Sequence, residues 1–440
     1  MTGRVAKPLP DRSPWLTVAG AFGRAAIAGR RLPPGRLVDV GELERAHRTE
    51  LIDLAARHGP VFKGLMEGRL VVCVVDTALG RRLLKEHASA LRPVSIRLES
   101  LFAHGFMRRM APDVHRRYRR ALMAALGAIE LDAFDPVFEA IAHDALQAHA
   151  LRGAAARDER FAAAPPGWPD VLAAIAADAL VALFFGTRPG EALHARLIEG
   201  YRRLGPHGVV WNVGARQADA FHALRALLAD GGGDGGGVLD RLRASGDVDD
   251  TMLGNLIYMV ELGRYDVRGL LRWISRYAAD HPAWLARIAD ESPAPGQPSA
   301  AARAFVHETL RMDQSERLMR DVLHDVKFDR WLIPAGAMLR VCLWEAHKDA
   351  DAFARPFAFD PARFLGDGPA PDGFSPFGLD HHHCPLAGAS VRIAAAFLRA
   401  LARGWEVDGH GAEPAVRGPY HWEPSPRFDV ALRPRAHGGH

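Results

Sequence analysis

Apolar residues recur at intervals of three and four along most of the chain, which is the spacing of amphipathic helices. The densest apolar stretch, residues 171–185, contains Asp178. We interpret it as a buried core helix, because a membrane-spanning helix needs roughly 18 or more nearly uncharged residues. Residues 15–23 are also apolar but are followed at once by Arg24. We expect residues 1–40 to form a loosely ordered N-terminal arm.

Two segments depart from the helical pattern. Residues 69–75 are a β-branched run that follows Gly59 and Pro60, and they predict a hairpin or small sheet capped by a helix. Residues 326–342 form a second strand-rich segment, with a turn at residues 333–336. The pattern therefore predicts a mainly α fold with small β-sheets, of the α+β class.

The charge and the cysteine content argue against a nucleic-acid-binding protein and against a disulfide-stabilised secreted protein. The 440 residues include 56 lysines and arginines and 52 aspartates and glutamates, so the net charge is 56 − 52 = +4. This positive charge is too small to indicate nucleic-acid binding. Three cysteines cannot build a disulfide framework, so we expect a cytoplasmic protein. We interpret Cys73 and Cys342, which lie in strand patterns, as buried packing residues.

The strongest chemical signal lies near the C-terminus. Residues 374–385 read Phe-Ser-Pro-Phe-Gly-Leu-Asp-His-His-His-Cys-Pro, and a helical pattern begins immediately afterwards. A cysteine at a helix N-terminus faces free N–H groups and the positive end of the helix dipole, which both favour the thiolate. Three adjacent histidines rarely converge on one zinc ion, because zinc ligands are usually spaced apart.

This segment resembles the cysteine loop of the cytochrome P-450 superfamily, Phe-x-x-Gly/Asp-x-His/Arg-x-Cys, with Phe377, Asp380, His382 and Cys384 at the matching places. Other motifs follow in the order of that family. The first is a Glu-x-x-Arg pair, Glu308 and Arg311. Four features follow it in order: Arg320 ahead of a strand, the turn at residues 333–336, residues 344–349 and residues 359–364. The same pair spacing also occurs at Glu42/Arg45, Glu199/Arg202 and Glu261/Arg264, so the order carries the resemblance.

The resemblance implies a single-domain cytochrome P-450 fold that encloses a haem, over residues 41–432, with residues 433–440 as a disordered tail. It implies haem b (iron protoporphyrin IX) with Cys384 as the iron ligand. The residues implied as partners of the haem propionates are His115, Arg119, Arg320 and His382. His115 and Arg119 lie one helical turn apart and share a face. Glu308, Arg311 and Arg363 are implied as a structural charge network.

One predicted helix departs from the family. Residues 259–267 read Met-Val-Glu-Leu-Gly-Arg-Tyr-Asp-Val, where ordinary monooxygenases of the family carry Ala/Gly-Gly-x-Asp/Glu-Thr. Alignment on Gly263 puts Tyr265 at the acid and Asp266 at the alcohol. A shift by one residue puts Asp266 at the acid and leaves Val267, which has no hydroxyl, at the alcohol, so neither register restores the pair. Leu386, after the cysteine, also stands where a small residue is usual.

Three explanations stay open. Tyr265 and Asp266 form an alternative proton relay, since a phenol donates and a carboxylate accepts. The substrate supplies its own hydroxyl. Alternatively the enzyme is not an oxygen-activating hydroxylase, and Arg264 holds a substrate carboxylate as in peroxide-using relatives. A non-catalytic haem-binding protein is the further alternative.

We expect a haem-thiolate oxidoreductase, with O₂-dependent monooxygenation of a small organic molecule in specialised (secondary) metabolism as the leading hypothesis. The chain ends soon after the cysteine helix, so the expected electron donors are a separate ferredoxin and ferredoxin reductase. We expect a monomer without a membrane anchor. Arg116, Arg117, Arg120 and Arg392 are candidates for a basic donor-docking face.

Overall fold

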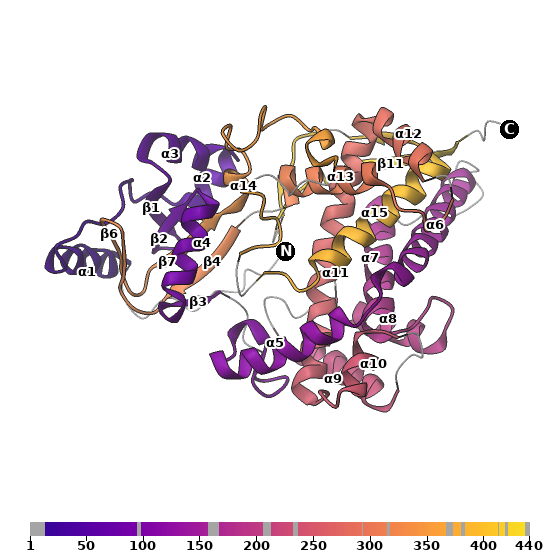
Figure 1. Ribbon diagram of the computed structural model, residues 1–440, viewed down its shortest axis with the longest axis horizontal. Helices are drawn as coiled ribbons and strands as arrows, with labels where there is room; N and C mark the ends of the chain where they lie inside the picture. Colours follow the sequence, from indigo (N-terminus) through magenta and orange to yellow (C-terminus); the bar gives the residue numbers. More distant parts are fainter. Residues whose placement is uncertain are drawn as a thin grey trace. The chain divides into compact units, whose positions relative to one another are not determined.

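The computed structural model describes residues 14–94, 98–156, 167–205, 213–231, 236–292, 294–314, 317–366, 373–379, 383–411, 413–418 and 421–435. These residues belong to two compact units. One unit consists of Met1–Val94, Ser315–Ala358 and Pro371–His383, and the other of Ser95–Gln314, Phe359–Ala370 and Cys384–His440. The expected mainly helical chain with small sheets is confirmed (Figure 1).

The first unit is built on a five-stranded sheet of order β1-β2-β7-β4-β3 (Figure 1). The strands β2 and β7 are parallel, and the other neighbouring pairs are antiparallel. Its strands are β1 (Val61–Met66), β2 (Arg69–Val74), β3 (Leu91–Pro93), β4 (Arg317–Val322) and β7 (Met338–Cys342), with the separate hairpin β5 (Val326–Phe328) and β6 (Trp331–Ile333). Its helices are α1 (Pro14–Ile27), α2 (Val40–Ala46), α3 (Glu50–His58), α4 (Thr77–Glu86), η1 (Ala88–Ala90) and α14 (Leu343–Ala346). Both sequence-predicted strand segments are thus confirmed.

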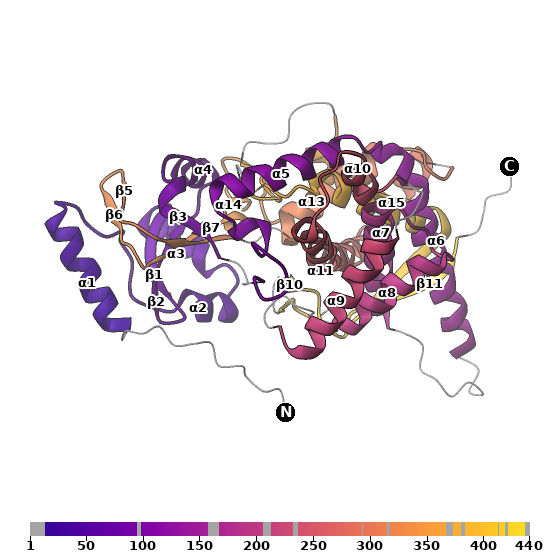
Figure 2. The same ribbon diagram turned by 90° about the horizontal axis from the view of Figure 1, so that it is seen from below.

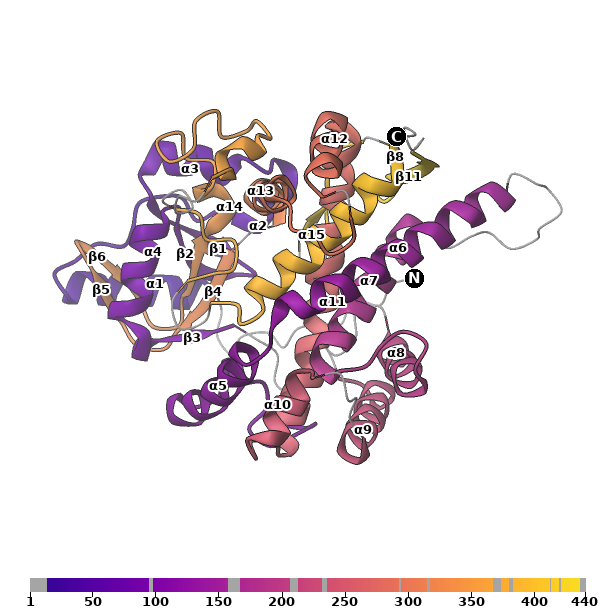
Figure 3. The same ribbon diagram turned by 45° about the vertical axis from the view of Figure 1, so that its right-hand side comes forward.

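Helix α1 differs from the expected N-terminal arm. It lies beside the β5–β6 hairpin (Figures 1 and 3), and its buried residues Val18, Ala21 and Ala25 join the core beneath the sheet. Arg24 donates to the Ala335 carbonyl at 2.9 Å and lies 3.5 Å from the Asp325 carboxylate. Arg24 ends the apolar run in the sequence, but it lies within α1 and its side chain holds the helix to the neighbouring segment.

A buried charge cluster stabilises the first unit. The guanidinium of Arg340, on β7, is 2.9 Å from the Glu44 carboxylate and 2.9 Å from the Glu345 carboxylate. Burial raises the pKa of Glu345, and the neighbouring Arg340 opposes that shift. Cys73 and Cys342 are also buried in this unit, as expected of packing residues.

The second unit is mostly helical. Its long helices are α5 (Pro112–Gly127), α6 (Leu131–Ala156), α7 (Trp168–Phe185), α8 (Ala192–Leu204), α9 (Ala215–Asp230), α11 (Asp250–Asp280) and α15 (Ala387–Gly404). The shorter helical elements are α10 (Val238–Ala244), α12 (Pro282–Glu291), α13 (Ala300–Thr309), η2 (Met107–Arg109), η3 (Leu310–Gln314) and η4 (Pro361–Phe364). Two small antiparallel pairs complete it, β8 (Trp405–His410) with β11 (Asp429–Pro434) and β9 (Val416–Arg417) with β10 (Trp422–Glu423).

Helix α11 runs through this helical unit with α7, α9, α13 and α15 around it (Figure 2). Helix α6 lies along α15 (Figure 3). Within the described part of the chain, α7 is the one helix long and apolar enough to cross a membrane, and 67% of it is buried. Its packing against α6 and α11 agrees with the predicted core helix.

The docking of α1 predicts that substitutions at two alanines of this helix affect its stability very differently. Ala21 is 1% exposed, whereas Ala26 on the same helix is exposed. Ala21→Asp places an unpaired carboxylate in the core, at a cost of about 3 kcal/mol, and should release α1. Hydrogen exchange of the α1 amides should then accelerate strongly. Ala26→Asp is the matched control, and equal protection in both variants would contradict the docking.

Candidate functional site

Cys384 stands immediately before α15 in the second unit. The backbone N–H of Leu386 donates a hydrogen bond to its sulfur, and the side chain of Leu386 is buried. The predicted placement of the cysteine at a helix N-terminus is therefore confirmed. The N–H groups and helix dipole at this position favour negative charge on the sulfur.

The groups around the Cys384 thiol shift its pKa in opposite directions. Burial raises its pKa, the N–H of Leu386 lowers it, and the Asp266 carboxylate raises it further. The guanidinium groups of Arg108 and Arg119 lower the pKa. The sulfur, one carboxylate and two guanidinium groups are therefore within electrostatic reach of one another. Because metal binding requires a deprotonated sulfur, a cation bonded to Cys384 would tip this balance toward the thiolate.

Helix α5 supplies the arginine on this side of the site. Arg119 is half-buried, and burial lowers its pKa while the Cys384 sulfur raises it. His115 lies one turn earlier on the same face and is also partly buried. Arg116 and Arg117 are exposed on another face of the helix. The predicted His-x-x-x-Arg face is therefore the one that brings Arg119 toward the sulfur.

The remaining sequence-predicted cofactor residues belong to the first unit. Arg320 lies within β4 rather than ahead of a strand, is 5% exposed and donates to the Met319 carbonyl at 3.0 Å. In the chain leading to the cysteine, the backbone N–H of Ser375 donates to His347 at 3.0 Å. His382 lies outside the described residues.

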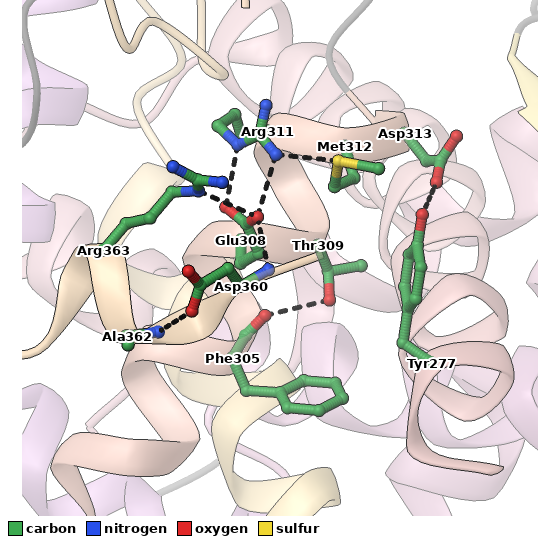
Figure 4. A network of polar contacts seen from close by, with 10 residues as sticks. All are labelled: Tyr277, Phe305, Glu308, Thr309, Arg311, Met312, Asp313, Asp360, Ala362 and Arg363. Atoms are coloured by element: carbon green, nitrogen blue, oxygen red, sulfur yellow. Dashed lines mark hydrogen bonds and ion pairs between the residues drawn. The ribbon is translucent and has the colours of Figure 1, made fainter. Parts of the chain in front are cut away.

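Glu308 forms the expected buried network in the second unit (Figure 4). Its carboxylate accepts two hydrogen bonds from Arg311, both at 2.8 Å, and one from Arg363 at 3.3 Å. The backbone N–H of Asp360 donates to the same carboxylate at 2.8 Å. Neither Glu308 nor Arg311 has any exposed side-chain surface. The network joins α13 to the η4 turn, which confirms the predicted structural role.

Arg264 on α11 is already engaged. Its guanidinium donates to both oxygens of Glu261, at 2.8 and 3.0 Å, and to the Gly205 carbonyl at 2.7 Å. Burial raises the pKa of Glu261 to about 7, and Arg264 opposes that shift. Burial lowers the pKa of Arg264, but Glu261 more than offsets that shift and raises it, so the two short contacts form a buried ion pair. The expectation that Arg264 holds a substrate carboxylate stays a prediction, and any such substrate would share the guanidinium with Glu261.

Tyr265 and Asp266 point into different surroundings. Tyr265 is buried, and burial raises the pKa of its phenol to about 12. Arg264 and Arg268 lie over its ring at 5.3 and 5.2 Å. Asp266 has 63% of its side chain exposed, and its carboxylate acts on the Cys384 sulfur. Of the two residues, Asp266 is the more exposed and is the one whose charge influences the Cys384 sulfur.

Three residues of this site were missed by the sequence analysis. Glu261 had a signal, since it opens a Glu-x-x-Arg pair with Arg264, but the same pattern at Glu199/Arg202 forms only an exposed pair. Arg108 and His421 had none, because Arg108 lies in the three-residue η2 helix and His421 follows Asp266 by 155 residues.

The chemistry of these groups fits a haem. A single cysteine sulfur with a backbone N–H on it suits a thiolate ligand to iron. Arg108 and Arg119 nearby provide charges that a buried propionate needs. Among the described residues no group of three or more His, Cys, Asp or Glu side chains is placed to hold a metal ion.

Comparison with known proteins gives consistent matches. A family model described as Cytochrome P450 matches residues 301–387, from α13 to the start of α15. Abscisic acid 8'-hydroxylase 3 of Oryza sativa subsp. japonica is 25% identical over 87% of this chain and 83% of its own length. The Mycobacterium bovis protein that bears the name cytochrome P450 138 is 24% identical over 80% of this chain and 83% of its own length.

The fold is similar to a solved structure, described as retinoic acid bound cyanobacterial CYP120A1. The TM-score is 0.70 at 17% identity, and the match covers 92% of this chain and all of the other. This similarity confirms the fold class expected from the sequence.

The Glu308 network predicts a large loss of stability for one substitution. Arg311→Met leaves a fully buried carboxylate with less compensation, which should cost about 3–5 kcal/mol. Arg202→Met removes the arginine of an exposed Glu-x-x-Arg pair and should cost less than about 1 kcal/mol. Urea unfolding of the two variants measures the difference. Equal losses would contradict the structural role of the network.

Proposed function

Because the chain belongs to the cytochrome P450 superfamily, we propose that it is a haem-thiolate monooxygenase that oxidises a small organic molecule with O₂. The observation that carries the proposal is the Cys384 sulfur, which is bonded by the Leu386 N–H and lies near two arginines. A haem with a thiolate-ligated iron supplies oxygen activation, because the thiolate donates electron density that favours O–O cleavage.

The chain's own residues hold the cofactor, which we propose to be haem b. Cys384 is the iron ligand, and the Leu386 N–H orients its sulfur. Arg119 and His115 on α5, with Arg320 and His382, serve the propionates. Four such donors can balance two carboxylates that would be costly to bury alone. The Glu308 network fixes the η4 segment.

The proposed electron donor is a separate ferredoxin with its reductase, and the proposed compartment is the cytoplasm, where we expect a monomer. Exposed Arg116, Arg117 and Arg120 on α5 support a basic surface for an acidic donor. Arg392 contributes less, because it is paired with Asp132 and Asp135.

The substrate we propose is a partly apolar organic molecule of specialised metabolism. Two similar proteins are named for organic acids, one as an abscisic acid hydroxylase and one as bound to retinoic acid. Abscisic acid and retinoic acid are therefore the first compounds to test for a ligand-induced shift of the haem absorption band.

The thiolate assignment predicts a spectroscopic loss. The reduced, carbon-monoxide-bound protein should show the band typical of thiolate ligation, and Cys384→Ala should lose it together with donor-supported turnover. Cys73→Ala changes a buried cysteine in the other unit and should keep both. A Cys384→Ala protein that keeps an unchanged haem spectrum would refute the assignment.

The peroxide alternative has a separate test at Arg264. Arg264→Leu leaves the buried Glu261 without its partner and should lower the unfolding free energy by about 3–5 kcal/mol. The double variant Glu261→Leu with Arg264→Leu should regain most of that stability, because no unpaired charge remains.

Our account predicts that this double variant keeps donor-supported turnover with O₂. If Arg264 instead holds a substrate carboxylate, the stable double variant loses efficient peroxide-supported turnover that the parent protein shows. That result would favour a peroxide-using enzyme over the proposed monooxygenase.

A further inference from the structure

Asp266 has a partner from a distant part of the chain. The Nε2 atom of His421 lies 2.8 Å from Oδ1 of Asp266. Asp266 lies on α11, and His421 immediately precedes β10. A carboxylate oxygen accepts a hydrogen bond from an imidazole N–H at this distance, and histidine is the side chain whose ordinary titration range is closest to neutral pH.

The pair is near the proposed iron ligand. The negative charge of Asp266 raises the pKa of the Cys384 thiol, which places its carboxylate within electrostatic reach of the sulfur. The Asp266 side chain is 63% exposed and that of His421 is 24% exposed. The Asp266 side chain is therefore the more exposed member of the pair, and the imidazole is the more enclosed one.

Other contacts already anchor the segment that carries His421. Arg272 on α11 forms an ion pair with Glu423 and donates to the carbonyls of Pro424 and Ser425 at 2.9 and 3.2 Å. The indole N–H of Trp273 donates to the Trp422 carbonyl at 2.9 Å. These contacts fix β10 against α11, so the imidazole is held in place and its bond to Asp266 is not needed as the anchor.

We propose that Asp266 and His421 form the proton-handling pair of this enzyme, in place of the acid and alcohol that ordinary family members carry. This inference rests on the proposed monooxygenase function. Monooxygenation consumes the organic substrate, O₂, two protons, and two electrons that the ferredoxin-type donor supplies. One oxygen atom enters the product and the other leaves as water. Each proton passes from the imidazolium N–H of His421 to the Asp266 carboxylate and then to the oxygen reactant. His421 regains its proton from solvent water.

Tyr265 has a supporting role at most. Its buried phenol, with a pKa raised to about 12, holds its proton at neutral pH. Other charged groups on the surrounding elements are Arg268 on α11, Arg417 on β9, and Glu423 on β10. These side chains do not have the near-neutral titration range of an imidazole. Glu261 on α11 has a pKa raised to about 7 by burial, but both of its oxygens accept hydrogen bonds from Arg264. His421 is therefore the member of this group suited to exchange protons with Asp266.

The first test uses carbon monoxide as a probe of the reduced, haem-loaded protein. The infrared C–O stretching band should shift between about pH 5 and pH 8 as the pair gains a proton. Asp266→Asn and His421→Gln should each abolish that pH dependence. His410→Gln is the matched control, since His410 pairs with Asp408 on strand β8 at 3.7 Å. A band whose pH dependence is the same in all four proteins would overturn the proposal.

The second test measures product formed per electron delivered. Asp266→Asn and His421→Gln should each divert electrons to peroxide and lower the rate of product formation by about 100-fold, the scale of a lost general acid. Substrate affinity should stay unchanged, and the double variant should be no worse than either single one. The side-chain amide introduced by His421→Gln keeps a hydrogen-bond donor but cannot relay a proton, so full coupling in that variant would overturn a proton-handling role.

Failure of the proposed function gives a different result. A protein without the thiolate-type carbon-monoxide band, or without donor-supported turnover, refutes the monooxygenase itself. A protein that has both, and whose coupling is untouched by the Asp266 and His421 substitutions, refutes only the proton-handling pair.

Discussion

The burial of one sulfur is the constraint on which the functional site depends. Burial raises the pKa of the Cys384 thiol, yet a metal ligand must carry the negative charge. The N–H of Leu386, just before α15, and the guanidinium groups of Arg108 and Arg119 lower the pKa of this thiol and so favour the thiolate. The helix N-terminus and the arginine face of α5 therefore serve the same electrostatic requirement from two sides.

Two acidic side chains on α11, Glu261 and Asp266, each have a close basic partner. Glu261 is bonded twice by Arg264 within one turn, and Asp266 is bonded by His421. The first pair is buried and tightly closed, which suits a structural role. The second pair is more exposed and its carboxylate influences the Cys384 sulfur, which suits proton exchange. The same helix thus separates a structural charge pair from a chemical one within a few residues.

The sequence was sufficient for features encoded locally or by ordered motifs. The position of Cys384 before a helix, the Glu308–Arg311 pair and both strand segments were predictable from spacing and residue type. Helix α1 was missed because its stability comes from docking Val18, Ala21 and Ala25 against the sheet, and from Arg24 reaching another segment. The partner of Asp266 was not predictable, since only the folded chain brings His421 across 155 positions.

The central claim is that the sulfur of Cys384, and not one of the adjacent histidines, is the protein's ligand to the haem iron. Iron X-ray absorption of the haem-loaded protein tests this most directly, because sulfur and nitrogen scatter differently at bonding distance. The account predicts one sulfur scatterer bonded to iron in addition to the porphyrin nitrogens. A first coordination shell that contains only nitrogen or oxygen would contradict it.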